Sequence, residues 1–334
     1  MKALVYTAPY TLEYREEPDP VPGPGEVLVA VESVGICGSD MHGYHGQDAR
    51  RPAPLILGHE AAGRIVTGPR TGERVALNPL VIDPSCHYAK EGRGHLSPTR
   101  EILSMPARPG AFAELVRIPS ENALAIADAT SYAHAALVEP MAVSWHAVGR
   151  GIHLLHGSIR QAHVVILGGG AIGVTAALAA RHFGARSVTI GETNELRRRR
   201  LQEAEGLSCY EPGGPEEPGE NSADLVIDAV GAVATRRAAC RMARPGAVIV
   251  HIGLLPGHDG LDIRKITLQE VTVTGTYCYS PEEFRASLAA IEAGQLGPMT
   301  WFETRPLADG AQAFADIDGG RAVHPKIVLE TGTA

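Results

Sequence analysis

The sequence has few cysteines, few aromatic side chains and no surplus of positive charge. Its net charge of −8 argues against a nucleic-acid partner, because neutralising phosphates requires a basic face. No run of apolar residues is long enough to cross a membrane, and the first residues lack the apolar core of a signal peptide, so we expect a cytoplasmic protein without a membrane partner. The five cysteines are odd in number and widely spaced, which favours free thiols or metal ligands over disulfides.

The rest of the composition is that of an ordinary globular protein, with 44% hydrophobic and 20% charged residues. A chain of 334 residues is too long for one typical hydrophobic core, so two domains are expected. Residues 1–149 are rich in proline and glycine, with short apolar runs at 26–34, 63–66 and 74–77. This pattern predicts a mostly β domain, and the helical spacing of 131–150 predicts a helix that leads out of it.

The pattern changes at residue 163, where short apolar runs begin to alternate with helical segments. The runs are 164–167, 188–190, 225–227, 248–252 and 271–274, and the helical segments are 172–183, 195–205 and 235–243. Buried parallel strands joined by crossover helices give this rhythm, so the sequence predicts a doubly wound α/β domain over 150–280. The helical segment 281–296 and the run 326–330 interrupt the rhythm and are expected to return to the first domain.

A glycine-rich turn follows the first of these strands. Gly168, Gly170 and Gly173 stand in the pattern G-x-G-x-x-G, between a predicted strand and a predicted helix. The first glycine permits the tight turn, the second lets the backbone approach a pyrophosphate, and the third lets helix and strand pack closely. The sequence therefore predicts a dinucleotide site, to which Ala171, Ile172, Val230 and Ile252 are also assigned.

The second strand of this domain ends next to Glu192. A carboxylate at this place accepts hydrogen bonds from the ribose hydroxyls and repels a 2′-phosphate, which favours NAD over NADP. Arg197 and Arg198 follow closely and would attract a 2′-phosphate, so the preference stays open. We include Arg197 among the expected cofactor contacts.

Three separate segments carry residues that bind zinc in other proteins. Cys37 follows the 26–34 run, His59 and Glu60 are adjacent in the chain, and Glu139 begins the later helix. A thiolate, an imidazole and carboxylates together can form a four-coordinate zinc site with an exchangeable position. Spacing alone does not join these segments, and each residue taken singly also fits a structural role.

The motifs GICGSDMH, GHEAAG, LVEP, GERV and GGGAIG occur in the chain, and together they resemble the zinc-dependent medium-chain dehydrogenases. The sequence is most similar to the polyol branch, with sorbitol, L-idonate and galactitol-phosphate dehydrogenases. The resemblance implies a GroES-like catalytic domain over 1–149 and 281–334, and a Rossmann domain over 150–280. It also implies a homodimer or homotetramer, paired through the edge of the Rossmann sheet near residues 271–276.

The resemblance also implies roles for single residues. Cys37 and His59 match the first two catalytic zinc ligands. Glu60 matches the acidic residue of the catalytic site that ligates the zinc or stands just behind it. Glu139 falls at the place of the third ligand and would reach the metal directly or through its water, and which of the two glutamates is the ligand stays open. Ser39 matches the hydroxyl of a proton relay, and His42 matches the outer member of that relay. The implied reaction is the NAD-dependent oxidation of a secondary alcohol to a ketone, in which zinc acts as a Lewis acid.

Many relatives carry a second, structural zinc held by four cysteines, and here the matching positions hold Asp83, Cys86, Ala89 and Ser97. Because a structural zinc needs a closed shell of four ligands, we expect this zinc to be absent. A makeshift site that uses Asp83, Cys86, His87 or His95 is the alternative.

The substrate is expected to be a polyol or a sugar derivative, because the expected zinc shell is rich in glutamate and poor in cysteine. Tyr44, His45 and Lys326 are candidates for lining its pocket, and each fits a structural role equally well. Two rivals remain: an amino-alcohol or simple secondary-alcohol dehydrogenase of the same family, and a metal-free NAD-binding or structural relative.

Overall fold

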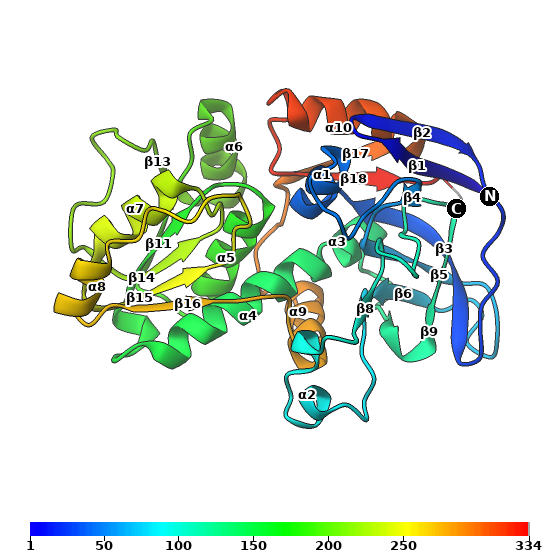
Figure 1. Ribbon diagram of the computed structural model, residues 1–334, viewed down its shortest axis with the longest axis horizontal. Coiled ribbons are helices and arrows are strands. Elements are labelled where there is room, and N and C mark those ends of the chain that lie inside the picture. The colour runs from blue at the N-terminus through cyan, green and yellow to red at the C-terminus, as the bar shows by residue number, and fades with distance from the viewer. Residues whose placement is uncertain (333–334) are drawn as a thin grey trace. The chain divides into compact units, whose positions relative to one another are not determined.

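The computed structural model describes residues 1–332, which form two compact units (Figure 1). The first unit combines Met1–Glu139, Ser280–Ala293 and the C-terminal segment that begins at Phe302. The second unit combines Pro140–Tyr279 and Gly294–Trp301. None of the helices in the described part of the chain has the length and apolar character needed to span a bilayer.

The first unit is built around a seven-stranded, mostly antiparallel sheet with β3 at its centre. The strand order is β10-β6-β5-β3-β18-β17, and β9 also pairs with β3. Its strands are β3 (Glu26–Gly35), β5 (Glu60–Ile65), β6 (Arg74–Leu77), β9 (Leu115–Pro119), β10 (Ala123–Ala125), β17 (Phe302–Pro306) and β18 (Lys326–Glu330).

Smaller elements complete this unit. A three-stranded antiparallel sheet consists of β1 (Lys2–Ala8), β2 (Thr11–Glu16) and β4 (Leu55–Ile56). A separate antiparallel pair consists of β7 (Leu80–Val81) and β8 (Glu101–Ile102). The α-helices are α1 (Gly38–Tyr44), α2 (His87–Lys90), α3 (Tyr132–Ala136), α9 (Pro281–Glu292) and α10 (Gly310–Asp318). Short 3₁₀ turns lie at Gly94–Leu96, Ser120–Asn122 and Leu307–Asp309.

Strand β3 has the alternation of a half-buried strand. Val27, Val29 and Val31 are buried, whereas the residues between them are partly exposed. Its last residues are buried on both faces, because β5 and β18 flank them. The C-terminal strand β18 pairs antiparallel with β3, so the end of the described chain belongs to the first unit.

The second unit is a doubly wound α/β domain. Its parallel sheet has the order β13-β12-β11-β14-β15-β16. The strands are β11 (His163–Leu167), β12 (Ser187–Gly191), β13 (Ser208–Tyr210), β14 (Ala223–Asp228), β15 (Ala243–His251) and β16 (Thr272–Gly275). The helices are α4 (Val138–Leu154), which starts in the first unit, α5 (Ala171–His182), α6 (Glu195–Glu205), α7 (Val233–Met242) and α8 (Ile263–Leu268), with a 3₁₀ turn at Ile159–Gln161.

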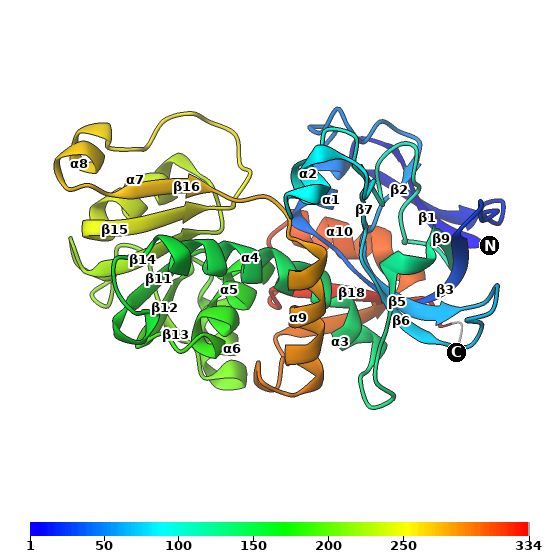
Figure 2. The same cartoon turned by 90° about the horizontal axis from the view of Figure 1, so that it is seen from below.

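Helices cover both faces of this parallel sheet. Figure 2 shows α4, α5 and α6 on one face and α7 on the other. The strands are therefore buried on both sides, which explains their continuous apolar runs in the sequence. The predicted fold class, a mostly β domain joined to a doubly wound α/β domain, is confirmed.

Two helices differ from the sequence prediction. The segment 131–150 forms two helices, α3 and α4, which are separated at Leu137. Pro140 explains the break, because it has no N–H to continue the hydrogen bonds of α3 and is tolerated only in the first turn of α4. Helix α9 ends at Glu292 and not at residue 296, since Gly294 and Gly297 adopt left-handed φ angles of 66° and 83°.

Candidate metal and cofactor site

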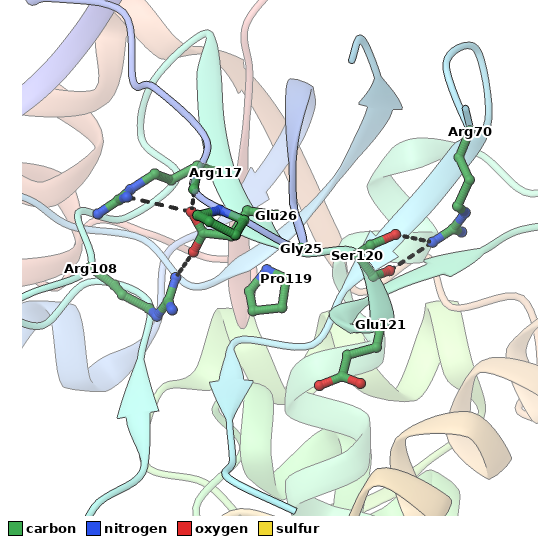
Figure 3. A pocket seen from close by; sticks show the side chains of 10 residues that line it. Gly25, Glu26, Arg70, Arg108, Arg117, Pro119, Ser120 and Glu121 are labelled. Atoms are coloured by element: carbon green, nitrogen blue, oxygen red, sulfur yellow. Dashed lines mark hydrogen bonds and ion pairs between the residues drawn. The ribbon is translucent and has the colours of Figure 1, made fainter. Parts of the chain in front are cut away.

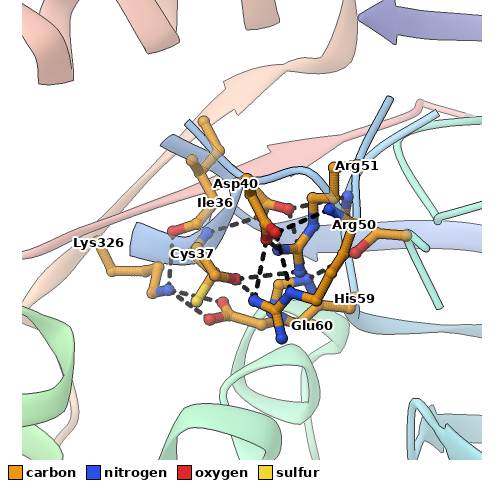
Figure 4. A network of polar contacts seen from close by, with 12 residues as sticks. Ile36, Cys37, Asp40, Arg50, Arg51, His59, Glu60 and Lys326 are labelled. Carbon is orange, nitrogen blue, oxygen red and sulfur yellow. Dashed lines mark hydrogen bonds and ion pairs between the residues drawn. The ribbon is translucent and has the colours of Figure 1, made fainter. Parts of the chain in front are cut away.

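Cys37, His59 and Glu60 come together where two inner strands of the first unit's main sheet, β3 and β5, end and begin. These three residues are called the metal group below. One possible ligand atom from each lies within 4.8 Å of the others, and within residues 1–332 no other group of three or more such side chains is found (Figure 4). The topology explains the meeting. Strand β3 ends just before Cys37, β5 begins at Glu60, and the antiparallel register sets Gly35 opposite Glu60.

Gly35 makes room for the Glu60 carboxylate. A Cβ atom at this position would lie 2.1 Å from Oε2 of Glu60, far inside van der Waals contact. A larger residue in place of this glycine of the GIC motif would therefore have to displace the Glu60 carboxylate, although its backbone angles are open to other residues.

Asp40 holds Cys37 and His59 of the metal group in place, and it was not identified from the sequence. Its Oδ2 accepts the backbone N–H of Cys37 at 3.0 Å, and its Oδ1 accepts that of Gly58 at 3.3 Å. Oδ1 also lies 3.4 Å from Nδ1 of His59, which is 3.2 Å from the Ser104 hydroxyl. Because Nδ1 is engaged in this way, Nε2 is the nitrogen left for a metal. An acidic residue three positions after Cys37, in the first turn of a helix, was the available signal.

The electrostatics of this group favour a bound cation. Burial alone would lower the pKa of His59, but the carboxylate of Asp40 and the thiol group of Cys37 outweigh burial and raise that pKa well above its usual value. Burial alone would raise the pKa of Asp40, but the neighbouring His59 and Arg51 hold it below its usual value. The negative charge around His59 that favours a proton would equally favour a metal cation, which binds the imidazole in place of that proton.

Lys326 forms a buried ion pair with Glu60. Its Nζ donates to both carboxylate oxygens, at 2.7 and 2.6 Å, and to the carbonyl of Ile36 at 2.8 Å. Burial alone would lower the pKa of Lys326, but Glu60, Cys37 and Glu139 raise it. The lysine is therefore charged, and its contacts fix the carboxylate of Glu60 beside Cys37.

Glu139 lies near this group without joining it. The side chain is buried at the start of α4 and acts on the charge of Lys326, but its carboxylate is not among the three ligand atoms that lie within 4.8 Å. Of the two glutamates considered from the sequence, Glu60 is the one placed against Cys37 and His59.

Ser39 and His42, the two residues assigned to a proton relay, do not contact each other through a hydrogen bond in the described part of the chain. The Ser39 hydroxyl lies 3.4 Å from Nε2 of His59 and accepts from Nη2 of Arg51 at 3.4 Å. Within residues 1–332, no hydrogen bond links Ser39 to His42, which is half-buried on α1. Burial lowers the pKa of His42.

The glycine-rich turn of the second unit has the geometry that its sequence predicts. Gly168 adopts a φ of 100°, and a Cβ atom there would lie 2.4 Å from the side chain of Val230. A Cβ atom at Gly173 would lie 1.8 Å from the carbonyl oxygen of Gly168, so helix α5 approaches the turn as closely as a glycine allows. Gly170 caps α5, and Ala171 and Ile172 form its first turn.

Glu192 lies beside the glycine-rich turn. Its Oε2 accepts the backbone N–H of Gly169 at 3.0 Å, and its Oε1 accepts that of Asn194 at 2.8 Å. Arg197 reaches Oε2 at 3.3 Å. The carboxylate and this guanidinium therefore form a pair at the carboxyl end of β12.

Val230 and Ile252 follow the carboxyl ends of β14 and β15. Both backbone N–H groups bond to Asp228, the first to its side chain at 3.1 Å and the second to its carbonyl at 2.9 Å. All the residues assigned to the cofactor thus lie at the carboxyl edge of one parallel sheet, where open α/β sheets bind their ligands.

Comparison with known proteins assigns the family. Two family models match, the alcohol dehydrogenase GroES-like domain over residues 23–128 and the zinc-binding dehydrogenase over residues 171–293. Sorbitol dehydrogenase of Bacillus subtilis (strain 168) is 32% identical over 289 residues, which cover 81% of this chain and 80% of that protein. The chain belongs to the zinc-binding dehydrogenases.

Two other known proteins are similar to this zinc-binding dehydrogenase over most of its length. L-galactonate-5-dehydrogenase of Escherichia coli (strain K12) is 30% identical over 297 residues, which cover 85% of each chain. The crystal structure of a short chain alcohol dehydrogenase from Escherichia coli CFT073, complexed with the cofactor NADH, matches with a TM-score of 0.87 at 25% identity and covers 99% of each chain. The enzyme class predicted from the motifs is therefore confirmed.

Zinc fits the donor set of this dehydrogenase. A thiolate, an imidazole with its second nitrogen engaged and a carboxylate are ligand types that zinc accepts in catalytic sites. Three protein ligands leave a fourth position for water or substrate, as catalytic zinc sites require.

The lobe that carries a second zinc in many relatives has a different local structure here. The Cys86 sulfur caps α2 by accepting the backbone N–H of Ala89 at 3.3 Å, and Ala89 itself offers no side-chain ligand. Asp83 accepts the backbone N–H of Ser85 at 2.8 Å. The absence of a structural zinc stays a prediction.

Tyr44 and His45, which were named as possible pocket residues, pack against helix α10. The ring of Tyr44 lies 5.3 Å from that of Phe314, and Nε2 of His45 lies 2.7 Å from Asp318. These contacts give both residues a structural role.

A hollow of about 790 Å³ lies elsewhere in the first unit (Figure 3). Arg108 in its wall pairs with Glu26 and Glu101, and Arg70 pairs with Glu73 and with the carbonyl of Ser120. None of its lining residues belongs to the metal group or to the relay. We therefore place the candidate reaction site at the metal group and not at this hollow.

Proposed function

We propose that the protein oxidises a secondary alcohol of a polyol or sugar-derived substrate to a ketone, with zinc and NAD as cofactors. The observation that carries the proposal is the group formed by Cys37, His59 and Glu60 in a chain of the zinc-binding dehydrogenase family. The names of the relatives, a sorbitol dehydrogenase and an L-galactonate-5-dehydrogenase, support this substrate class.

The metal-binding role is assigned to Cys37, His59 and Glu60, with Glu139 outside the direct ligands. Zinc held there supplies a Lewis acid that makes the alcohol proton easier to remove. Asp40 sets the orientation of the imidazole, and Lys326 holds the carboxylate of Glu60 in place. Glu60 acts as a ligand and as an anionic neighbour of the reacting alcohol.

Ser39 is the residue through which the alcohol proton leaves: its oxygen receives that proton while its own hydroxyl hydrogen passes to the next acceptor. Its hydroxyl lies beside the metal group and already accepts a hydrogen bond from Arg51, so its own hydrogen is free to turn toward another acceptor. His42 is proposed as the outer member of this relay, and a water molecule or a rotation of His42 is needed to connect the two.

The second unit is proposed to bind NAD along the carboxyl edge of its sheet, and NAD supplies the hydride acceptor. Gly168, Gly170 and Gly173 shape the pyrophosphate site, with Ala171 and Ile172 in the first turn of the helix. Glu192 and Arg197 lie where the adenosine ribose is expected, and Val230 and Ile252 line the same edge.

We also propose that two copies of the chain pair through strand β16. This strand closes one side of the parallel sheet, and only β15 pairs with it among the described strands. Apolar side chains are exposed on it and on the neighbouring segments: Leu254, Leu255, Leu261, Ile263, Leu268 and Val273. An exposed strand edge with apolar neighbours is suited to self-pairing about a two-fold axis.

The reaction is tested with a panel of polyols, sugar acids and simple secondary alcohols, with NADH absorbance as the readout. Wild type is expected to oxidise a polyol or sugar acid, and the activity should disappear on chelation and return with zinc. Cys37→Ala is expected to lose bound zinc and to lower kcat/KM by on the order of a thousandfold, because the Lewis acid is lost.

Cys86→Ala is the matched control, because Cys86 is also a partly exposed thiol of the first unit but lies outside the metal group. It should keep both zinc and activity. Full activity of Cys37→Ala, or turnover that is unaffected by chelation, would refute the proposed function.

A further inference from the structure

A buried arginine lies directly beside the relay hydroxyl. Arg51 is only 3% exposed, and its Nη1 donates to Oδ2 of Asp48 at 2.5 Å. Its Nη2 donates to the Ser39 hydroxyl at 3.4 Å, and its Nε is buried without a hydrogen-bond partner (Figure 4). One side of this guanidinium therefore faces the proposed reaction site.

The carboxylate that pairs with Arg51 also pairs with a second arginine. Arg50 contacts both oxygens of Asp48, at 2.9 and 3.0 Å, and its backbone N–H donates to Oδ1 at 3.0 Å. Burial alone would raise the pKa of Asp48, but the hydrogen bonds from Arg50, together with the charge of Arg51, lower it to about 2. One carboxylate thus serves two guanidinium groups.

The other nearby carboxylate is also engaged. Asp40 accepts two backbone N–H groups and faces His59, although the charge of Arg51 also acts on it. Arg51 therefore shares its directly paired carboxylate, Asp48, with Arg50, so the two guanidinium groups carry one more positive charge than Asp48 balances. Such a charge is costly unless an anion completes its pairing.

We propose that Arg51 selects substrates that carry an anionic oxygen group, a carboxylate or a phosphate, over neutral polyols. This inference rests on the proposed function, because it requires the reacting alcohol to lie beside Ser39. The planar fork of a guanidinium matches the oxygens of either anion.

The geometry suits a sugar acid or a sugar phosphate. Two contacts of 3.4 Å, from Nη2 of Arg51 to Ser39 and from Ser39 to His59, separate the guanidinium from the metal group. A few carbon atoms of a polyol chain bridge such a separation, so one end of the substrate reacts while its anionic end meets Nη2. Arg50 keeps Asp48 paired when the guanidinium turns toward the anion.

The test measures binding by calorimetry on the zinc-loaded protein with NADH. The probes are L-galactonate, galactitol 1-phosphate and sorbitol, which share a polyol chain and differ in charge. Wild type should bind at least one anion roughly tenfold or more tightly than sorbitol, with a smaller difference at high salt. The anion that binds more tightly identifies the carboxylate or the phosphate as the natural group.

Arg51→Gln should weaken binding of the preferred anion by roughly 10- to 100-fold and change sorbitol binding by less than about twofold. Arg51→Lys keeps the charge but loses the fork, so it should fall between wild type and Arg51→Gln. Arg64→Gln is the matched control, because it removes an exposed positive charge from the same unit. It should bind all three probes like wild type.

The inference is overturned if wild type binds sorbitol as tightly as both anions. It is also overturned if Arg51→Gln weakens all three probes equally while keeping its zinc and its melting temperature, since that result indicates a general structural role. If Arg51→Gln does not fold, the wild-type preference and Arg51→Lys decide the question. Tight anion binding without any turnover with NAD contradicts the proposed reaction and leaves the role of Arg51 intact.

Discussion

Gly35 shows how a residue without a side chain shapes the metal group. It stands opposite Glu60 in the β3–β5 pair, and any Cβ atom there would collide with the carboxylate. Asp40 also shapes this group, since its single carboxylate fixes both the backbone of Cys37 and the ring of His59. The candidate ligands are therefore held in position without a metal, which would reduce the free-energy cost of binding one.

Glu192 gives a prediction at the same scale. Replacing it with serine removes the negative charge from the proposed ribose site and releases Arg197 from its 3.3 Å ion pair. Glu192→Ser should therefore bind NADPH roughly tenfold more tightly than wild type and NADH several-fold more weakly. Fluorescence titration with both reduced cofactors measures the change.

Glu195→Ser is the control for this prediction. Glu195 is exposed at the start of α6, the helix that carries Arg197, and it pairs with Arg199. It should leave the ratio of the two affinities unchanged. An unchanged ratio in Glu192→Ser would instead show that this carboxylate does not select the cofactor.

Single residues also mark the limit of what the sequence reveals. Cys37, His59 and Glu60 were identified because they lie in motifs that resemble a known family, although their spacing alone did not join them. Ser104 and Arg51 carry no such signal, because their roles depend on contacts with His59 and Ser39 that are distant in the chain. A contact across 45 residues, as between Ser104 and His59, is not encoded by any local pattern.

At the scale of elements, the sequence predicted strands better than helix ends. The runs at 74–77 and 164–167 correspond to β6 and β11, because buried strands leave continuous or alternating apolar patterns. Helix ends depend on caps and breakers whose effect is visible only in context. Pro140 divides one periodic segment into α3 and α4, and Gly294 stops α9 early.

Strand β16 gives a prediction at this scale. Val273 lies on this strand with 37% of its surface exposed. If two copies pair through β16, an aspartate at this position places like charges close together across the two-fold axis. Val273→Asp should therefore convert the dimer into a monomer at micromolar concentration, as measured by light scattering coupled to size-exclusion chromatography.

Val66→Asp is the matched control, because Val66 is 39% exposed and lies in the first unit. It should not alter the mass in solution. A Val273→Asp protein with the mass of wild type would exclude pairing through this edge.

At the scale of the whole molecule, the chain should hold one zinc. The described residues contain one group with the spacing of metal ligands, and the lobe around Cys86 offers a single thiol. Metal analysis after dialysis should therefore give close to one zinc per chain, and Cys37→Ala should give close to none. Two tightly held zinc ions per chain would show that the lobe binds metal by other ligands.

The pairing of β18 with β3 has a consequence for how the enzyme is made. Lys326, which neutralises Glu60, lies 266 residues later in the chain. A growing polypeptide that has been synthesised only as far as β16 already contains all three candidate ligands, but it has no lysine to balance the buried glutamate. Completion of the metal centre therefore waits for the last segment to be translated, so a ribosome-bound chain should capture zinc less firmly than the released protein.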